Sequence, residues 1–299
     1  MLDPELRALN LARIDLAEPM LAAARSALAE RRRAAAQRAD TTGVSVDAGN
    51  ADGVAVRIYR GAPAPAPAVV YCHAGAFVLG DLDTDHRACV ELARRGRCAV
   101  ISVDYRLAPE HRCPAALDDA LTVLRWVAAR AGELGVDPGR LAVAGSSAGA
   151  ALAAGLAQLA AEDAAPRVLF QLLHQPVLDE RATPSKTRFA AAPAFDGAAA
   201  DLMWRHYLGA ADPSAPAVPA RRRRLDDLVA AFISCAQLDP LRDEAVDYAV
   251  RLLDAGVATE LHLFPGTCHG FDALVPDSER SQQLFALQGA ALRRAFAVH

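Results

Sequence analysis

One short stretch of the chain has the residue types and spacing of a nucleophilic serine. Gly145-Ser146-Ser147-Ala148-Gly149 matches the pattern G-x-S-x-G, which places a serine on a sharp turn between a strand and a helix. Apolar residues precede it ("RLAVAGS") and an alanine-rich stretch follows it, so both flanking elements are expected. Glycines remove Cβ atoms that would clash at such a turn, and a helix N-terminus favours developing negative charge. Because the glycines are centred on position 147, Ser147 is the predicted nucleophile rather than Ser146.

A serine nucleophile needs a base, and the base needs a carboxylate that orients it. Asp239 follows the expected strand "AFISCA", and His269 follows the next expected strand, "TELHLFPG". Parallel strands present their carboxyl ends at one edge of a sheet, so both side chains should emerge beside Ser147. The chain order serine, acid, histidine also fits the motif. Three competitors are Asp243, interpreted as a helix-start charge, and two histidines on strands, His174 and His262.

The third requirement is a set of N–H donors for the oxyanion of the tetrahedral intermediate. The segment "CHAGAF" follows a buried strand and contains small residues at positions 74 to 76. We expect the backbone N–H groups of Gly75 and Ala76 to converge with that of Ala148, which directly follows the nucleophile. The alternative interpretation of this segment is a tight turn without a ligand.

The elements that must position these residues alternate between strand and helix. Strands are expected at residues 54–60, 68–73, 98–105, 140–146, 168–177, 231–236 and 259–266. Helices are expected within the first 40 residues, at 85–96 with Gly96 at the end, from Pro114, after Ser147, from about Asp243, and at 278–297. This alternation predicts an α/β fold with a mostly parallel sheet. Residues 181–220 interrupt the alternation, so this segment and the N-terminal helices are candidates for a cap.

The composition excludes several classes of protein. The 299 residues carry a formal net charge of −4, which gives no electrostatic reason to expect nucleic acid as a partner. No uncharged apolar run reaches the roughly 18 residues of a membrane span, and the N-terminus is unlike a secretory signal. The six cysteines lack metal-site spacing, so neither a bound metal nor a disulfide framework is expected. These features predict a cytoplasmic protein.

Five segments, "HAGAF", "DYRLAPEHRCPAALDDA", "GSSAG", "DPLRDE" and "HGF", occur in the order seen in bacterial esterases of the hormone-sensitive-lipase family. From about residue 68 to the C-terminus the chain resembles that family. The resemblance implies the α/β-hydrolase fold, with helices on both faces of the sheet and a helical cap. It also implies hydrolysis of carboxylic esters of short to medium acyl chain by a Ser-His-Asp acyl-enzyme mechanism, without metal or organic cofactor. Some members of the family are homodimers, so a homodimer is a further expectation.

Carried over by position, the resemblance makes Ser147 the nucleophile, Asp239 the acid and His269 the base. Gly75, Ala76 and Ala148 supply the oxyanion N–H groups, and His73 supports the loop that carries two of them. The implied domains are N-terminal cap helices (1–45), a catalytic domain (46–180 and 221–299) and a cap insertion (181–220).

The sequence departs from the family pattern beside the expected site. Ala74 and Ala76 replace two of three usual glycines, Ser146 replaces a usual aspartate, and Ala150 replaces a usual glycine. If Ala76 requires a positive φ, its Cβ carries a strain of about 1 kcal/mol or more. We therefore expect an intact triad with an altered rate or substrate range.

Several alternatives remain open. The same triad serves esters, lactones, amides and specialised O-acetyl metabolites, and related folds include small-molecule receptors that lack catalysis. The residues expected either to line the substrate pocket or to form the core of the cap are Phe77, Phe195, Met203, Trp204, His206 and Tyr207. The run Arg221 to Arg224 is interpreted as a solvated loop face, with an anionic partner as the alternative.

Overall fold

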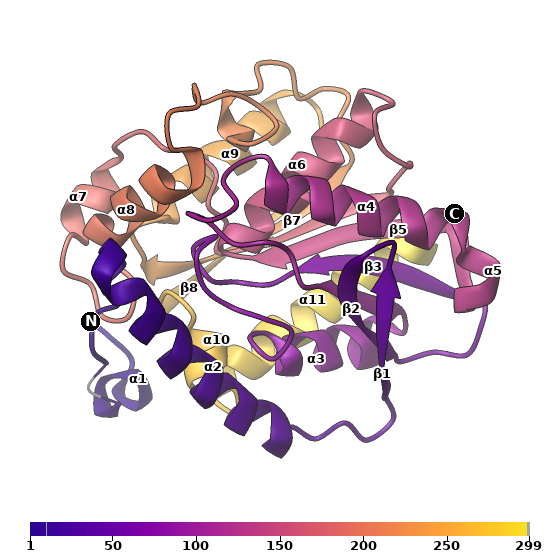
Figure 1. The fold of residues 1–299 in the computed structure, drawn as a ribbon, viewed down its shortest axis with the longest axis horizontal. Helices are drawn as coiled ribbons and strands as arrows, with labels where there is room; N and C mark the ends of the chain where they lie inside the picture. Colours follow the sequence, from indigo (N-terminus) through magenta and orange to yellow (C-terminus); the bar gives the residue numbers. More distant parts are fainter. Residues whose placement is uncertain (10, 298–299) are drawn as a thin grey trace.

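An eight-stranded sheet forms the centre of the computed structural model, which describes residues 1–9 and 11–297 (Figure 1). The strands lie in the order β1-β2-β4-β3-β5-β6-β7-β8. Only the β1–β2 and β2–β4 pairings are antiparallel, so the predicted mostly parallel α/β sheet is confirmed. The strands are β1 (Ser45–Ala51), β2 (Val54–Arg60), β3 (Ala66–Cys72), β4 (Ala99–Val103), β5 (Val136–Ser146), β6 (Phe170–His174), β7 (Ala230–Leu238) and β8 (Thr259–Cys268).

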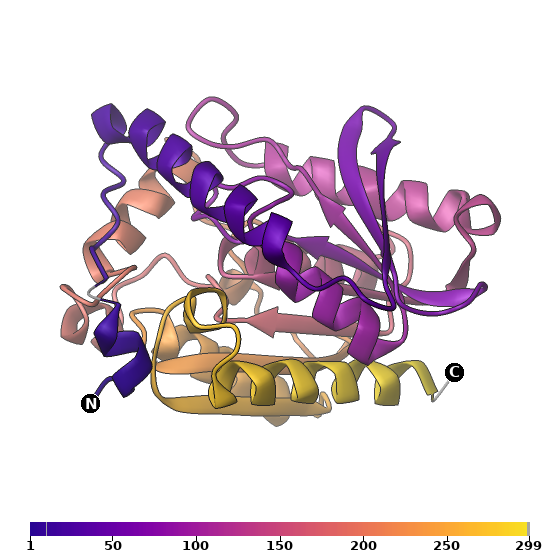
Figure 2. The same ribbon diagram turned by 90° about the horizontal axis from the view of Figure 1, so that it is seen from below.

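The central strands are buried on both faces because helices cover each side of the sheet. Helices α3 (His86–Gly96) and α11 (Glu279–Ala297) pack on one face. Helices α4 (Ala115–Ala129), α6 (Ala148–Ala161) and α9 (Arg242–Asp254) cover the other. Figure 2 shows α11, in yellow, along one side of the strands and α4 on the opposite side. The fold is therefore a three-layer arrangement of helices, sheet and helices.

Five further helices gather where the parallel strands end, at the left of Figure 1. They are α1 (Pro4–Ala8), η1 (Glu18–Met20), α2 (Leu21–Arg38), α7 (Pro184–Arg188) and α8 (Gly197–Leu208). The short helix η2 (Pro219–Arg221) lies instead beside the C-terminal ends of α6 and α9, where Gln158 donates to Pro219 O and Arg251 donates to Ala220 O. The N-terminal segment and the 181–220 insertion bind each other. Ile14 N donates to Ala194 O at 2.9 Å, Arg13 pairs with Asp196 at 3.2 Å, and His206 Nε2 lies 2.8 Å from Leu16 O. These contacts join the two segments that the sequence assigns to the cap.

Several details differ from the sequence-based expectations. Helix α3 ends at Gly96, as expected, but the left-handed residue that follows the helix is Arg97, with φ of 52°. Gly96 is instead packed in the helix, close to Leu292 and Cys98. The helix expected from Pro114 ends at Ala129, and a separate short helix α5 (Ala131–Leu134) follows. Strand β1 has no counterpart in the expected elements, because its residues alternate only weakly between apolar and polar.

Among the residues described, no helix has the length and apolar character needed to cross a membrane.

Candidate active site

The nucleophile turn is built by the end of β5 and the start of α6. Ser147 adopts φ of 56° and ψ of −118°, a strained conformation for a residue other than glycine. A Cβ on Gly145 would overlap the Gly149 backbone, and a Cβ on Gly149 would overlap the carbonyl of Cys72 on β3. The glycines thus let the two ends of the turn approach each other and the neighbouring strand.

The structure brings Ser147, His269 and Asp239 together. His269 Nε2 lies 3.0 Å from Ser147 Oγ, and His269 Nδ1 lies 2.8 Å from Asp239 Oδ2. Asp239 Oδ1 accepts the backbone N–H of Leu241 at 2.8 Å, which fixes the carboxylate in the loop before α9. Asp239 is fully buried and the serine is 3 % exposed. This arrangement can transfer a proton from the hydroxyl to the imidazole while the carboxylate holds Nδ1 protonated.

Electrostatics favour a proton on His269. Burial lowers the pKa of His269, but the charge and hydrogen bond of Asp239 outweigh that effect, with a further contribution from Asp272. The pKa of His269 therefore lies above its ordinary value of 6.5. An imidazole with this bias is a stronger acceptor for the serine proton.

The loop after β3 places two free N–H groups near the start of α6. Gly75, Ala76 and Phe77 have φ values of 140°, 55° and 60° in succession. The first of these needs glycine, because a Cβ at Gly75 would overlap the carbonyl of Leu79. Within residues 1–9 and 11–297, the N–H groups of Gly75, Ala76 and Ala148 donate to no protein acceptor. Ala76 does have the positive φ that the sequence analysis considered, so this alanine carries left-handed strain.

Three buried side chains hold that loop. Asp85 Oδ2 accepts the N–H of Ala74 at 2.8 Å and the hydroxyl of Tyr71 at 3.0 Å. His73 Nδ1 lies 2.7 Å from Ala74 O, and its ring stacks on Tyr105 with 4.1 Å between centroids. Tyr105 also donates to the carbonyl of His73 at 2.7 Å. His73 thus contacts both the loop and the ring of Tyr105 that packs beside it.

Asp85 was not predicted from the sequence as a site residue. This residue occupies the N-cap position of α3, where a capping role is the ordinary expectation for aspartate. Its carboxylate is directed to the loop after β3 instead. The neighbouring sequence, "LDTDH", carries no signal that separates the two roles.

The six residues named for the pocket or cap core occupy different places. Phe195 packs against the imidazole of His269, with 4.9 Å between ring centroids. Phe77 stacks on Tyr207 at 3.8 Å, and Trp204 lies against both rings. These three and Met203 are buried together, whereas His206 binds the N-terminal segment. Phe195 therefore packs directly against a member of the triad.

The competing residues lie outside the triad. Asp243 accepts the N–H of Ser185 at 2.7 Å and pairs with Arg242. His262 pairs with Glu260 at 2.6 Å on strand β8. His174 is buried between Ser234 and Asp272. The arginines at 221, 222 and 224 each pair with a nearby carboxylate, which leaves the loop face as the better interpretation of that run.

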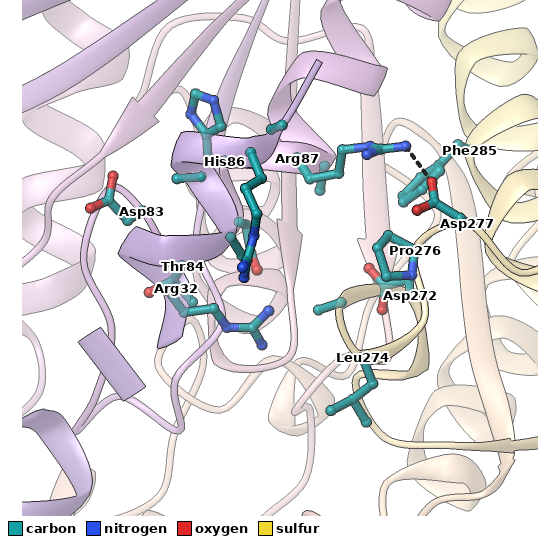
Figure 3. Close-up of a pocket in the computed structure, with 17 residues that line it drawn as sticks. Arg32, Asp83, Thr84, His86, Arg87, Asp272, Leu274, Pro276, Asp277 and Phe285 are labelled. Carbon is teal, nitrogen blue, oxygen red and sulfur yellow. Dashed lines mark hydrogen bonds and ion pairs between the residues drawn. The ribbon is translucent and has the colours of Figure 1, made fainter. Parts of the chain in front are cut away.

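A cavity of about 460 Å³ lies between α2, α3 and the short helix α10 (Phe271–Leu274). Figure 3 shows Arg32, Thr84, His86 and Asp272 around it, with Arg87 paired to Asp277 at 3.0 Å. Asp85, which supports the loop after β3, also belongs to its wall. In the part of the chain that the structure describes, no group of three or more histidine, cysteine, aspartate or glutamate side chains could hold a metal ion.

Several known proteins with the same fold and similar sequences are named as esterases. A family model described as α/β-hydrolase fold matches residues 69–273. The esterase LipI of Mycobacterium tuberculosis is 43% identical over 231 residues, which cover 75% of this chain and 72% of that protein. An ethyl acetate hydrolase of Pseudomonas putida is 40% identical over 229 residues, covering 72% and 70%. The crystal structure of esterase LipW from Mycobacterium marinum is 60% identical, with a TM-score of 0.96 and coverage of 99% and 96%.

Proposed function

Because this chain belongs to the hormone-sensitive-lipase-like family of the α/β-hydrolase fold and is a carboxylesterase, we propose that Ser147, His269 and Asp239 carry out its ester hydrolysis. The observation that supports this assignment is the continuous hydrogen-bonded path from Ser147 Oγ through the imidazole to Asp239. The serine and the imidazole come from loops 122 residues apart in the chain.

In the first step Ser147 Oγ attacks the ester carbonyl carbon while its proton moves to His269 Nε2. The carbonyl oxygen becomes an oxyanion, and the N–H groups of Gly75, Ala76 and Ala148 stabilise it. When the tetrahedral intermediate collapses, the C–O bond to the alcohol breaks and the imidazolium gives its proton to the departing alkoxide. The products of this half-reaction are the free alcohol and an acyl group on Ser147.

In the second step water attacks the acyl-serine and gives a proton to His269 Nε2. Collapse of the new tetrahedral intermediate breaks the bond to Ser147 Oγ, which regains a proton from the imidazolium. The carboxylic acid then leaves. Asp239 stays ionised throughout and stabilises the imidazolium in both steps.

The proposed substrates are small-molecule esters of short to medium acyl chain. This range is supported by Phe195, whose bulky ring packs against His269. A relative named for hydrolysis of ethyl acetate, whose acyl group is short, supports this range. In this proposal residues 1–45 and 181–220 form the cap, and residues 46–180 and 221–299 form the catalytic domain.

We also propose a cytoplasmic location and a homodimer. All six cysteines, each within the described residues, are free thiols, which is typical of a reducing compartment. The dimer rests on the family resemblance, and size-exclusion chromatography with light scattering tests it.

The experiment that tests the assignment is hydrolysis of p-nitrophenyl esters with acyl chains of increasing length. Ser147→Ala should lower turnover of the acetate and butyrate by several orders of magnitude while the protein stays folded. Wild-type turnover in that variant would contradict the assignment. A decline in kcat/KM from butyrate to longer acyl chains is expected, and a preference for long chains would contradict the proposed substrate range.

A further inference from the structure

The last residue of β6 and the residue after it connect the nucleophile turn to the histidine loop. The carbonyl of His174 accepts the N–H of Ser147 at 2.8 Å. The side-chain amide of the next residue, Gln175, binds the peptide groups on both sides of His269. Its Oε1 accepts the N–H of Gly270 at 2.7 Å, and its Nε2 donates to Cys268 O at 3.4 Å. Two adjacent residues therefore contact the backbone of both reacting groups.

Gln175 adopts a strained backbone conformation. Its φ is 46°, a left-handed conformation that costs a residue other than glycine about 1 kcal/mol or more. The N–H of Gln175 donates to Ser234 O at 2.6 Å, which anchors the residue to β7. Only 1 % of Gln175 is exposed, so its amide is not available to solvent. Strain of this kind persists where surrounding contacts determine the conformation. Here those contacts are the hydrogen bonds from the Gln175 side chain to the peptide groups beside His269.

The side chain of His174 contacts the same loop at Asp272, three residues after His269. Its Nδ1 lies 2.9 Å from Ser234 Oγ, and its Nε2 lies 3.0 Å from Asp272 Oδ1. Asp272 belongs to α10, the short helix that begins two residues after His269, and Figure 3 shows it at the wall of the cavity beside α2. The loop that carries His269 is thus tied to β6 at Cys268, Gly270 and Asp272.

We propose that Gln175 is a positioning residue for His269. Its side-chain amide binds the peptide groups before and after His269 and so holds the imidazole where Nε2 faces Ser147 Oγ. This inference rests on the proposed roles of Ser147 and His269. Without the hydrogen bonds of Gln175, the imidazole would sample orientations away from Ser147 Oγ, and a misplacement of about 1 Å can cost roughly 100-fold in rate. Substrate binding does not depend on that orientation, so the loss should fall on kcat.

A matched control lies on the same strand. Gln171 is also fully buried, and its Nε2 donates to a single backbone carbonyl, that of Val229, at 3.1 Å. It lies near the start of β6, at the end of the strand away from the triad. Gln171→Met therefore removes a buried amide of the same kind without touching the histidine loop.

The test compares kcat and KM for p-nitrophenyl butyrate in Gln175→Met, Gln175→Glu, Gln171→Met and Ser147→Ala. Gln175→Met should lower kcat about 10- to 100-fold with KM changed less than about twofold. Gln175→Glu keeps an acceptor for the N–H of Gly270 but loses the donor to Cys268 O and buries an unpaired carboxylate, so it should lose kcat as Gln175→Met does. Gln171→Met should retain kcat within about twofold. If Gln175→Met does not fold, Gln175→Asn, one methylene shorter, takes its place with the same expected loss.

A proton NMR signature separates positioning from general destabilisation. The resonance of the His269 Nδ1 proton in its hydrogen bond to Asp239 should broaden or shift in Gln175→Met and stay unchanged in Gln171→Met. An unchanged kcat in Gln175→Met or in Gln175→Glu, or equal losses in the two methionine variants, would overturn the inference. If the role of Gln175 is overturned but Ser147→Ala still abolishes turnover, the proposed function stands. Turnover retained in Ser147→Ala would overturn both.

Discussion

Oδ2 of Asp239 lies 2.8 Å from Nδ1 of His269, while Oδ1 of the same carboxylate accepts the N–H of Leu241 at 2.8 Å. The carboxylate is therefore fixed on both oxygens and is fully buried. This geometry determines which tautomer of the imidazole faces Ser147, because Nδ1 carries the proton and Nε2 is left to accept one.

The first prediction concerns pH. Activity needs neutral His269, and its pKa lies above 6.5 because the effect of Asp239 outweighs burial. We expect kcat/KM to fall as the pH decreases through a midpoint above 6.5. In Asp239→Asn that midpoint should move to lower pH and kcat should fall about 10³- to 10⁴-fold. Initial rates between pH 5 and 9 measure the midpoint and kcat in wild type and in Asp239→Asn. The same midpoint in the two proteins would contradict an interaction between Asp239 and His269.

The second prediction concerns the glycines of the nucleophile turn. A Cβ on Gly149 would overlap the carbonyl of Cys72, so Gly149→Ala should destabilise the fold by about 3 kcal/mol or more. Gly132 in α5 is the control, since a Cβ there meets nothing within 4 Å. Gly132→Ala should leave activity unchanged and stabilise by about 0.5–1 kcal/mol. Urea unfolding of both variants checks this, and equal stabilities would contradict the crowding argument.

The third prediction compares two neighbours in the loop after β3. Gly75→Ala introduces a Cβ that overlaps the carbonyl of Leu79, so the N–H donors should lose their alignment and kcat should fall about 10²- to 10³-fold. Ala76→Gly relieves left-handed strain at φ of 55° and should keep kcat within a few-fold of wild type. Steady-state kinetics of the two variants measure these changes in kcat. Similar kcat values for the two variants would show that these residues do not supply the oxyanion donors.

The fourth prediction concerns a buried ion pair between the 181–220 insertion and α9. Lys186, the sole lysine of the chain, places Nζ 2.7 Å from Glu244 Oε2, and both side chains are buried. Lys186→Met leaves a buried carboxylate without its partner and should cost about 3–5 kcal/mol. The double variant Lys186→Met/Glu244→Gln should cost clearly less than the sum of the two single changes. Chemical denaturation of the four proteins tests the coupling, and additive costs would mean that the two charges do not interact.

The triad could be anticipated from sequence because each member directly follows a strand. Ser147, Asp239 and His269 come after β5, β7 and β8, and parallel strands bring their carboxyl ends to one edge. The positioning residues could not be anticipated in the same way. Asp85 and Gln175 act through backbone groups 11 and 95 residues away, and those pairings depend on strand register and loop conformation. An aspartate before a helix and a glutamine after a strand have many ordinary roles.

Some elements of the fold could be predicted from the sequence and others could not. Apolar runs marked the buried strands well, since β3 and β4 are covered on both faces. Strand β1 lies at the edge of the sheet and is mostly exposed, so no burial pattern marked it. The left-handed residue after α3 is Arg97 rather than a glycine, a choice that local sequence rules do not favour.

The most direct test of the account is covalent labelling with a fluorophosphonate, followed by peptide mass spectrometry. An activated serine displaces fluoride and forms a stable phosphonyl ester. We predict one adduct per chain, on the peptide that contains Ser147, with loss of esterase activity in proportion to labelling and no adduct in Ser147→Ala. An adduct on another residue, or full esterase activity in a chain labelled at Ser147, would contradict the central claim.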